Sequence, residues 1–304
     1  MNISFICTVY NEENTIIKLL ESINQQTQPP DEIVIVDAGS TDSTVNKIRQ
    51  FSTKIPVKII IKPCPRGQGR NLAIKQARGE VIAVSDAGCI ARRDWLAKIT
   101  QPITARKIDV VAGFYQMTTK GTQYYTAPFV GVTPQRINPK TFLPSSRSIA
   151  FTKSAWKKVG GYPKNLNYAE DIVFAQSLAN HPDIHMIAQP QALVEWSPPT
   201  TYREFFRALV NYTQGNIIAG YTRHLKKNAL VVIRYAIGIQ LLLAATISLN
   251  PVLLALGIML LAVYSLYPAW KFHYLIRSPL DIIMFGWTQL VADLAILYAL
   301  FTPI

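Results

Sequence analysis

The sequence divides near residue 228 into a charged part and an almost uncharged part, and this division constrains the possible folds most strongly. The last 76 residues contain three basic and two acidic side chains, whereas residues 1–228 contain 28 basic and 16 acidic side chains. Three apolar stretches occupy the uncharged part: 229–249, 251–268 and 282–301. Each is about as long as a helix that crosses ~30 Å of hydrocarbon, although the short middle stretch could instead be buried or re-entrant. We therefore predict a polar domain at residues 1–222 and a membrane region at residues 223–304 with about three transmembrane helices.

The charges that flank the apolar stretches predict an orientation in the membrane. Basic residues precede the first stretch and separate the second from the third: Arg223, Lys226, Lys227, Lys271 and Arg277. The turn at Asn250-Pro251, which could join the first two stretches as a hairpin, carries no charge, and neither does the tail after Phe301. Because basic loops stay in the cytosol, we predict a multi-pass protein of the cell membrane whose polar domain faces the cytosol.

The polar domain alternates between strand-like and helix-like runs. Buried-strand patterns occur at 3–9, 32–37, 57–62 and 80–85, and helical patterns between them at 13–25, 43–51 and 69–77. This order predicts an α/β fold with right-handed βαβ units and a mostly parallel sheet flanked by helices. Ligands of such a sheet bind at the carboxyl ends of its strands.

The rest of the polar domain is less regular. Residues 113–147 are rich in Thr, Pro, Gly and Tyr, and a long loop of this kind is more often functional than structural. Helical patterns return at 154–159 and 170–179. Residues 202–221 form an amphipathic pattern that could lie along a membrane surface.

Three acidic clusters follow strand patterns or begin helix patterns. The run from Asp37 to Asp42 follows the second strand, Ser85-Asp86-Ala87-Gly88 follows the fourth, and Glu170-Asp171 begins a helix. Asp37 could accept a hydrogen bond from a nucleoside, Asp86 could hold Mg²⁺ or Mn²⁺, and Asp171 could act as a general base. Each cluster also has a structural interpretation. The first could be a strand–turn–helix junction, the second a polar turn, and the third a helix start stabilised by the helix dipole.

A glycine-containing run, Arg66-Gly67-Gln68-Gly69-Arg70-Asn71, lies between the first two clusters. It loosely matches a dinucleotide-binding fingerprint, but the third glycine is missing and no strand leads directly into it. A phosphate site at the start of a helix, with Arg66 and Arg70 nearby, is the better interpretation.

The order and spacing of these motifs identify a resemblance that covers roughly residues 1–220. The chain resembles a family 2 glycosyltransferase with the GT-A fold. The matching runs are 8–13 (TVYNEE), 36–42 (VDAGSTD), 67–71 (GQGRN), 86–88 (DAG), 160–162 (GGY) and 170–171 (ED).

The resemblance implies a nucleotide-sugar site. Thr8, Tyr10 and Glu12 match the segment that lines the nucleoside pocket, Asp37 matches the acid that hydrogen-bonds the base, and Arg70 matches a residue near the nucleotide.

The resemblance also implies catalytic groups. Asp86 matches the first acid of a metal-binding DXD motif, and Asp171 matches the general base of an inverting displacement, with Glu170 beside it. The second DXD acid is replaced by Gly88, so Mg²⁺ or Mn²⁺ would be held by Asp86, the diphosphate and water. The QxxRW motif of processive polymer synthases is missing, since Gln214-Gly215-Asn216 lacks the Arg-Trp pair, and this favours transfer of single sugars.

The expected partners follow from charge, hydropathy and the resemblance together. A net charge of +13, without an arginine-rich arm or zinc-finger spacing, favours a membrane surface and a phosphate-bearing substrate over nucleic acid. The resemblance implies a nucleotide diphosphate sugar as donor, and the apolar stretches favour a lipid or lipid-linked glycan as acceptor, in the synthesis of a glycolipid or a cell-envelope polysaccharide. Two alternatives stay open: a nucleotidyltransferase, which the run Tyr10-Asn11-Glu12-Glu13 argues against, and an inactive membrane-anchored protein that only binds nucleotide sugars.

Overall fold

The structure is a computed structural model that describes residues 1–106, 108–138, 142–220 and 222–302. It divides into two compact units, the first made of residues 1–118 and 133–197 and the second of residues 119–132 and 198–304. The second unit thus combines the apolar helices with two segments of the predicted polar domain. The division at residue 222, which concerns insertion into the membrane, stays a prediction.

The first unit is built on a sheet of eight strands within the described residues. The strands are β1 (Ile3–Val9), β2 (Glu32–Asp37), β3 (Val57–Ile61), β4 (Val81–Val84), β5 (Cys89–Ala91), β6 (Val110–Met117), β7 (Ile149–Thr152) and β8 (Met186–Trp196). Their order in the sheet is β3-β2-β1-β4-β7-β6-β8-β5. The first four strands are parallel, as predicted, and β7 pairs antiparallel with both β4 and β6. The predicted fold class, a mostly parallel sheet with flanking helices, is confirmed.

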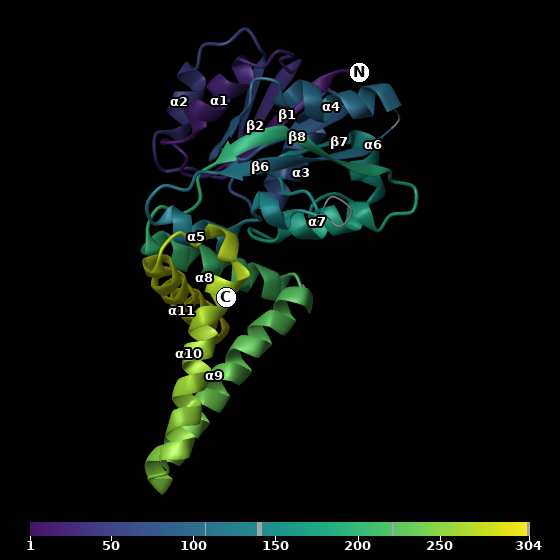
Figure 1. Cartoon of the computed structure of the whole chain (residues 1–304). Coiled ribbons are helices and arrows are strands. Elements are labelled where there is room, and N and C mark those ends of the chain that lie inside the picture. The colour runs from purple at the N-terminus through teal and green to yellow at the C-terminus, as the bar shows by residue number, and fades with distance from the viewer. Residues whose placement is uncertain (107, 139–141, 221, 303–304) are drawn as a thin grey trace. The chain divides into compact units, whose positions relative to one another are not determined.

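Helices cover both faces of this sheet (Figure 1). They are α1 (Ile16–Asn24), α2 (Thr44–Gln50), α3 (Arg66–Gln76), α4 (Trp95–Arg106), α6 (Lys153–Lys158) and α7 (Glu170–Ala179). Neighbouring residues of β1 point to opposite faces: Ile6 joins a core with α3, α6 and α7, whereas the ring of Phe5 meets Trp95 of α4. Burial on both faces explains why β1, β2 and β4 are continuous apolar runs.

The segment predicted to be less regular, 113–147, contains more structure than expected. It includes most of β6, helix α5 (Gln123–Val130) and a short 3₁₀ helix, Pro134–Arg136, while residues 139–141 lie outside the described residues. These elements were not predicted because α5 contains Pro128 and β6 contains Gly113, and such residues are unusual inside a helix or a strand.

The second unit contains α5 and the helices α8 (Tyr202–Ile218), α9 (Thr222–Ser248), α10 (Pro251–Lys271) and α11 (Pro279–Phe301), with a short 3₁₀ helix at His273–Leu275. The amphipathic helix is thus found where it was predicted, although its expected last residue, Tyr221, lies outside the described residues. The predicted hairpin is also present: the Asn250 side chain accepts a hydrogen bond from the backbone N–H of Val252 and begins α10.

Three helices are long and apolar enough to cross a membrane, as predicted: Asn228–Ser248, Pro251–Lys271 and Pro279–Phe301. The middle segment is longer than its predicted extent of 251–268, and its length no longer distinguishes it from the other two.

Candidate active site

A buried arginine connects two of the three predicted acidic clusters. Arg70, in the second turn of α3, is 1% exposed. One guanidinium nitrogen lies 2.7 Å from Oδ1 of Asp86, just beyond β4, and the other donates to the carboxylate of Glu170 at the start of α7. The structure therefore brings residues 70, 86 and 170 together, although they are far apart in the chain.

Two glycines of α3 allow the helix to approach its neighbours closely. A side-chain carbon at Gly67 would lie 1.9 Å from the carbonyl oxygen of Pro163, and one at Gly69 would lie 3.1 Å from the methyl group of Thr8. The backbone N–H of Gly67 also donates to the carbonyl of Leu166. The glycine-containing run therefore acts through close packing of α3 against β1 and the loop before α7.

The residue after Arg70 fixes that loop. The Asn71 side chain donates to the carbonyl of Tyr162 and accepts hydrogen bonds from the backbone N–H of Tyr162 and the indole of Trp156. Gly161 has a φ of +81°, and any side chain there would meet Asn71 and Trp156. The 160–162 motif thus joins the α6–α7 connection to α3.

The charges around Asp86 determine its protonation. Burial raises the pKa of Asp86, but the guanidinium groups of Arg70, Arg147 and Arg66 outweigh this effect and hold it below its ordinary value. Asp86 is therefore ionised at neutral pH, and its side chain is 34% exposed. Glu170 is 3% exposed, and burial raises its pKa above the ordinary value because the opposing charge of Arg70 offsets this effect only in part.

Asp171 lies in the first turn of α7, beside Glu170. Its side chain is partly exposed, and one carboxylate oxygen accepts a hydrogen bond from the backbone N–H of Ile172 at 2.9 Å. The preceding residue, Ala169, has a φ of +64°, in the left-handed region that alanine seldom adopts. A sharp turn thus leads into the two acids.

Asp37 is fully buried, and its carboxylate is used within its own turn. It accepts hydrogen bonds from the backbone N–H groups of Gly39 and Ser40, both at 2.9 Å, and from the Ser40 hydroxyl. These hydrogen bonds are the ones that the structural interpretation of the cluster expects, since they fix the turn after β2. Direct contact with a base stays a prediction.

The predicted nucleoside segment is held against this turn. The Asn11 side chain accepts from the backbone N–H of Thr41, and the backbone N–H of Glu12 donates to the Thr44 hydroxyl. Burial raises the pKa of Glu12, and the Asp86 charge adds to this effect. Tyr10 is 58% exposed, so its ring is accessible to a ligand.

Thr8 is the third predicted residue of the nucleoside segment. Its hydroxyl is buried and has no hydrogen-bond partner among the residues that the structure describes. It lies where α3 packs on β1, next to Gly69.

Arg147 was not predicted as part of the site. It is one of three cations that lower the pKa of Asp86, and its guanidinium lies 3.9 Å from the ring centroid of Trp196. No motif marks it, since it occurs in a stretch without a recognisable pattern.

The described residues offer a divalent ion few protein ligands. Within the described ranges, no group of three His, Cys, Asp or Glu side chains is arranged to hold a metal. A side-chain carbon at position 88 would meet no atom within 4 Å, so the space for a second acid exists but glycine leaves it open. Asp86 is thus a single carboxylate, and it fits an ion whose other ligands are substrate phosphates and water.

Comparison with solved structures agrees with this fold. The chain of Staphylococcus aureus TarS 1-349 in complex with UDP-GlcNAc aligns with a TM-score of 0.54 and 21% identity, over 70% of this chain and 66% of that one. The mannosyltransferase PcManGT from Pyrobaculum calidifontis, in complex with GDP-Man and Mn²⁺, aligns with a TM-score of 0.59 and 19% identity, over 98% of this chain and 87% of that one.

Sequence comparison identifies the family. Glycosyltransferase AglE from Haloferax volcanii is 30% identical over 193 residues, which are 60% of this chain and 59% of AglE, so the chain spans little more than half of that relative. The model of the family described as "Glycosyl transferase family 2" matches residues 4–159, just over half of the chain. The resemblance inferred from the motifs is thereby confirmed, and the chain belongs to glycosyl transferase family 2.

Proposed function

We propose that this protein transfers a sugar from a nucleotide diphosphate sugar to a lipid or lipid-linked glycan at the membrane. Transfer is inverting and adds one sugar at a time. The observation that carries the proposal is the buried bridge from Asp86 through Arg70 to Glu170. It holds the turn after β4 next to the start of α7, and these are the two segments that carry the predicted leaving-group and base functions.

The donor side of the proposal rests on charge. Arg70 is already neutralised by two carboxylates, so the cations that act on a diphosphate are Arg66 and Arg147, whose fields reach Asp86. Groups held in position before the reaction stabilise a developing charge without reorganisation. The related folds solved with UDP-GlcNAc and with GDP-Man carry different bases, so the fold alone leaves the base open.

Metal binding depends on Asp86. A Mg²⁺ or Mn²⁺ ion on this carboxylate would offset the negative charge of the leaving diphosphate. Arg66 and Arg147 share that function, which explains how the chain tolerates Gly88 at the second acidic position of the motif.

The acceptor side depends on Asp171. As the acceptor hydroxyl oxygen bonds to the anomeric carbon, the bond from that carbon to the diphosphate breaks, and Asp171 takes the hydroxyl proton. Glu170 has its carboxylate on Arg70, so it is a positioning residue that holds the first turn of α7. Asp171, which is partly exposed, is the acid available to a substrate.

The apolar helices support a membrane acceptor and a multi-pass location with the first unit in the cytosol. Side chains such as Ile247, Val252 and Val263 are 84%, 63% and 64% exposed, and exposed apolar surface of this extent is typical of contact with lipid. An enzyme that acts only on soluble acceptors does not need such a surface.

The test compares Asp171→Asn with the wild-type chain. We expect the variant to lose sugar transfer but to bind the nucleotide diphosphate with nearly the same affinity, because the amide cannot accept the proton. Asp183→Asn, at an exposed position after α7, is the matched control and should leave transfer unchanged. Turnover by Asp171→Asn at the wild-type rate would remove Asp171 from the base role, and loss of nucleotide binding would point to a structural role instead.

A further inference from the structure

Helix α11 differs from α9 and α10 in how its surface is covered. A third of its most apolar stretch is buried (33%), compared with 17% and 19% for the other two. Its exposed large residues form one stripe at helical spacing: Leu280, Ile283, Trp287, Leu290, Leu294, Tyr298 and Phe301. Its opposite face is buried and includes polar groups, among them Asp281, Thr288 and Asp293.

The buried face of α11 is covered along its length by α5 and α8 of the same unit. Near its start, the Tyr125 hydroxyl of α5 donates to Asp281 at 2.9 Å. Further along, the hydroxyl groups of Tyr202 and Thr288 lie 2.8 Å apart, and the Gln214 side chain donates to the Thr302 hydroxyl at 3.4 Å.

These contacts conflict with an α11 that crosses the bilayer. Helix α8 meets α11 from Thr288 to Thr302, a rise of about 21 Å at 1.5 Å per residue. A crossing α11 would therefore carry α8 through most of the ~30 Å hydrocarbon core. Because α8 exposes Arg203, Glu204 and Arg207, three charged side chains would lie in lipid at a high cost.

An ion pair between two helices leads to the same conclusion. The Arg234 guanidinium of α9 lies 3.3 Å from the carboxylate of Asp293, which is fully buried. Arg234 comes six residues after Asn228, about 9 Å into the first apolar stretch, whereas Asp293 comes 14 residues after Pro279, about 21 Å along α11. Two helices that both entered from one surface would hold these residues at different depths.

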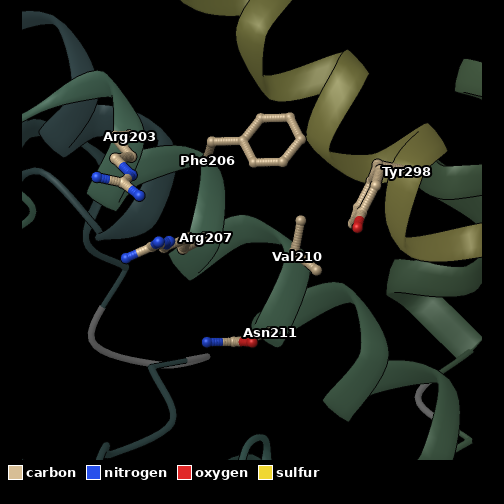
Figure 2. A pocket seen from close by; sticks show the side chains of 6 residues that line it. All are labelled: Arg203, Phe206, Arg207, Val210, Asn211 and Tyr298. Carbon is tan, nitrogen blue, oxygen red and sulfur yellow. The ribbon is translucent and has the colours of Figure 1, made fainter. Parts of the chain in front are cut away.

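A pocket with two arginines opens on α8 and α11. It has a volume of 480 Å³ and is lined by Arg203, Phe206, Arg207, Val210, Asn211 and Tyr298. Figure 2 shows that Arg203 and Arg207 point to the same side of α8, while Phe206 is directed toward α11. No ion pair neutralises either arginine within the described parts of the chain.

We propose that α8 and α11 form one layer in the plane of the membrane interface, and that only the α9–α10 hairpin crosses the bilayer. The apolar stripe of α11 faces the acyl chains, and the pocket takes the phosphate of an anionic phospholipid head group on Arg203 and Arg207. Within the second unit, the tip of the hairpin extends beyond α8 and α11 in Figure 1, as a crossing hairpin requires. This inference rests on the membrane association proposed above but not on sugar transfer.

The layer predicts the side of the membrane on which the last turn of α11 lies. Two full-length variants test it in intact cells with a membrane-impermeant maleimide: Leu249→Cys at the hairpin tip and a cysteine appended after Ile304. We expect labelling of Leu249→Cys from outside and labelling of the appended cysteine only after the membrane is opened. The unaltered chain measures the background from its own three cysteines. Labelling of the appended cysteine from outside would establish three spans and overturn the layer.

The pocket is tested with the purified full-length chain in detergent. We expect it to bind dioctanoyl phosphatidylglycerol, and Arg203→Gln with Arg207→Gln to weaken that binding about 30-fold, from the usual contribution of two basic residues at an anionic surface. Arg49→Gln with Lys54→Gln removes the same charge from exposed positions of the first unit and should change nothing. Equal loss in both double variants, or binding of inorganic phosphate as tight as that of the lipid, would overturn the assignment to a head group.

Discussion

Replacing Arg70 by methionine tests the buried bridge on which the site depends. The change leaves the carboxylate of Glu170 at 3% exposure without its cation, whereas Asp86, at 34%, can be hydrated. Removing one partner of a buried ion pair costs about 3–5 kcal/mol. For a unit of this size each kcal/mol lowers Tm by about 2–4 °C, so we expect a decrease of about 6–20 °C.

The assay is thermal unfolding of the purified full-length chain, followed by tryptophan fluorescence. Adding Glu170→Met to Arg70→Met should recover most of the lost thermal stability, because two apolar side chains can replace a buried ion pair at little cost. Arg93→Met, at an exposed arginine, is the control and should stay within about 0.5 kcal/mol of the wild type. The reasoning is refuted if Arg70→Met unfolds within 2 °C of the wild type (about the shift of 1 kcal/mol), or if the double variant is no more stable than the single one.

Three further predictions concern packing, pH and thiol chemistry. Gly67→Ala should lower stability by about 1–3 kcal/mol or more, because its side chain would overlap a backbone oxygen, whereas Gly88→Ala, which meets no atom within 4 Å, should leave Tm nearly unchanged. Folding lowers the pKa of Asp86, so its ionised form adds to the free energy of unfolding. This contribution is complete above the unfolded pKa of about 3.9 and is lost as pH falls through the folded pKa, so the stability of Asp86→Asn should not show this loss in acid. Burial raises the pKa of Cys89 to about 12, so mass spectrometry after brief maleimide treatment at pH 7.5 should find Cys64 modified and Cys89 intact.

The sequence predicted the parallel half of the sheet closely. The observed β1 and β2 have the expected bounds, and β3 ends one residue earlier than expected. Strands β1 and β2 are buried on both faces, so each is a mostly apolar run bounded by turn residues, and such a run is visible without knowledge of its neighbours. Strand β3, at the edge of the sheet, is only partly buried.

The other half of the sheet depends on pairings that a sequence pattern does not carry. Strand β8 pairs with both β6 and β5, and its central Pro190 interrupts the apolar run. The register between β6 and β8 shifts beside Gly113, where a side-chain carbon would lie 2.1 Å from the Ser148 hydroxyl. Helix α4 contains Pro102, which argues against a helix in any local analysis.

The candidate site was predicted as separate motifs, and the structure supplies the connection between them. Arg70, Asp86 and Glu170 were each identified, but their shared ion pairs join positions up to 100 residues apart. The hydrogen bonds that Asp37 accepts within its own turn were not predicted, and its contact with a base stays a prediction. Arg147 acts through a charge that only the folded chain brings near Asp86.

The central claim is sugar transfer to a membrane acceptor, and it is measured most directly with the full-length chain in isolated membranes. The chain is incubated with a panel of radiolabelled nucleotide diphosphate sugars, with and without Mn²⁺, and both the released nucleotide and the label in the lipid extract are counted. We predict that one donor gives nucleoside diphosphate and lipid-extractable sugar in equal amounts. Donor binding without release would instead describe an inactive binding protein. In a parallel incubation with nucleoside triphosphates and sugar phosphates, formation of pyrophosphate would describe a nucleotidyltransferase.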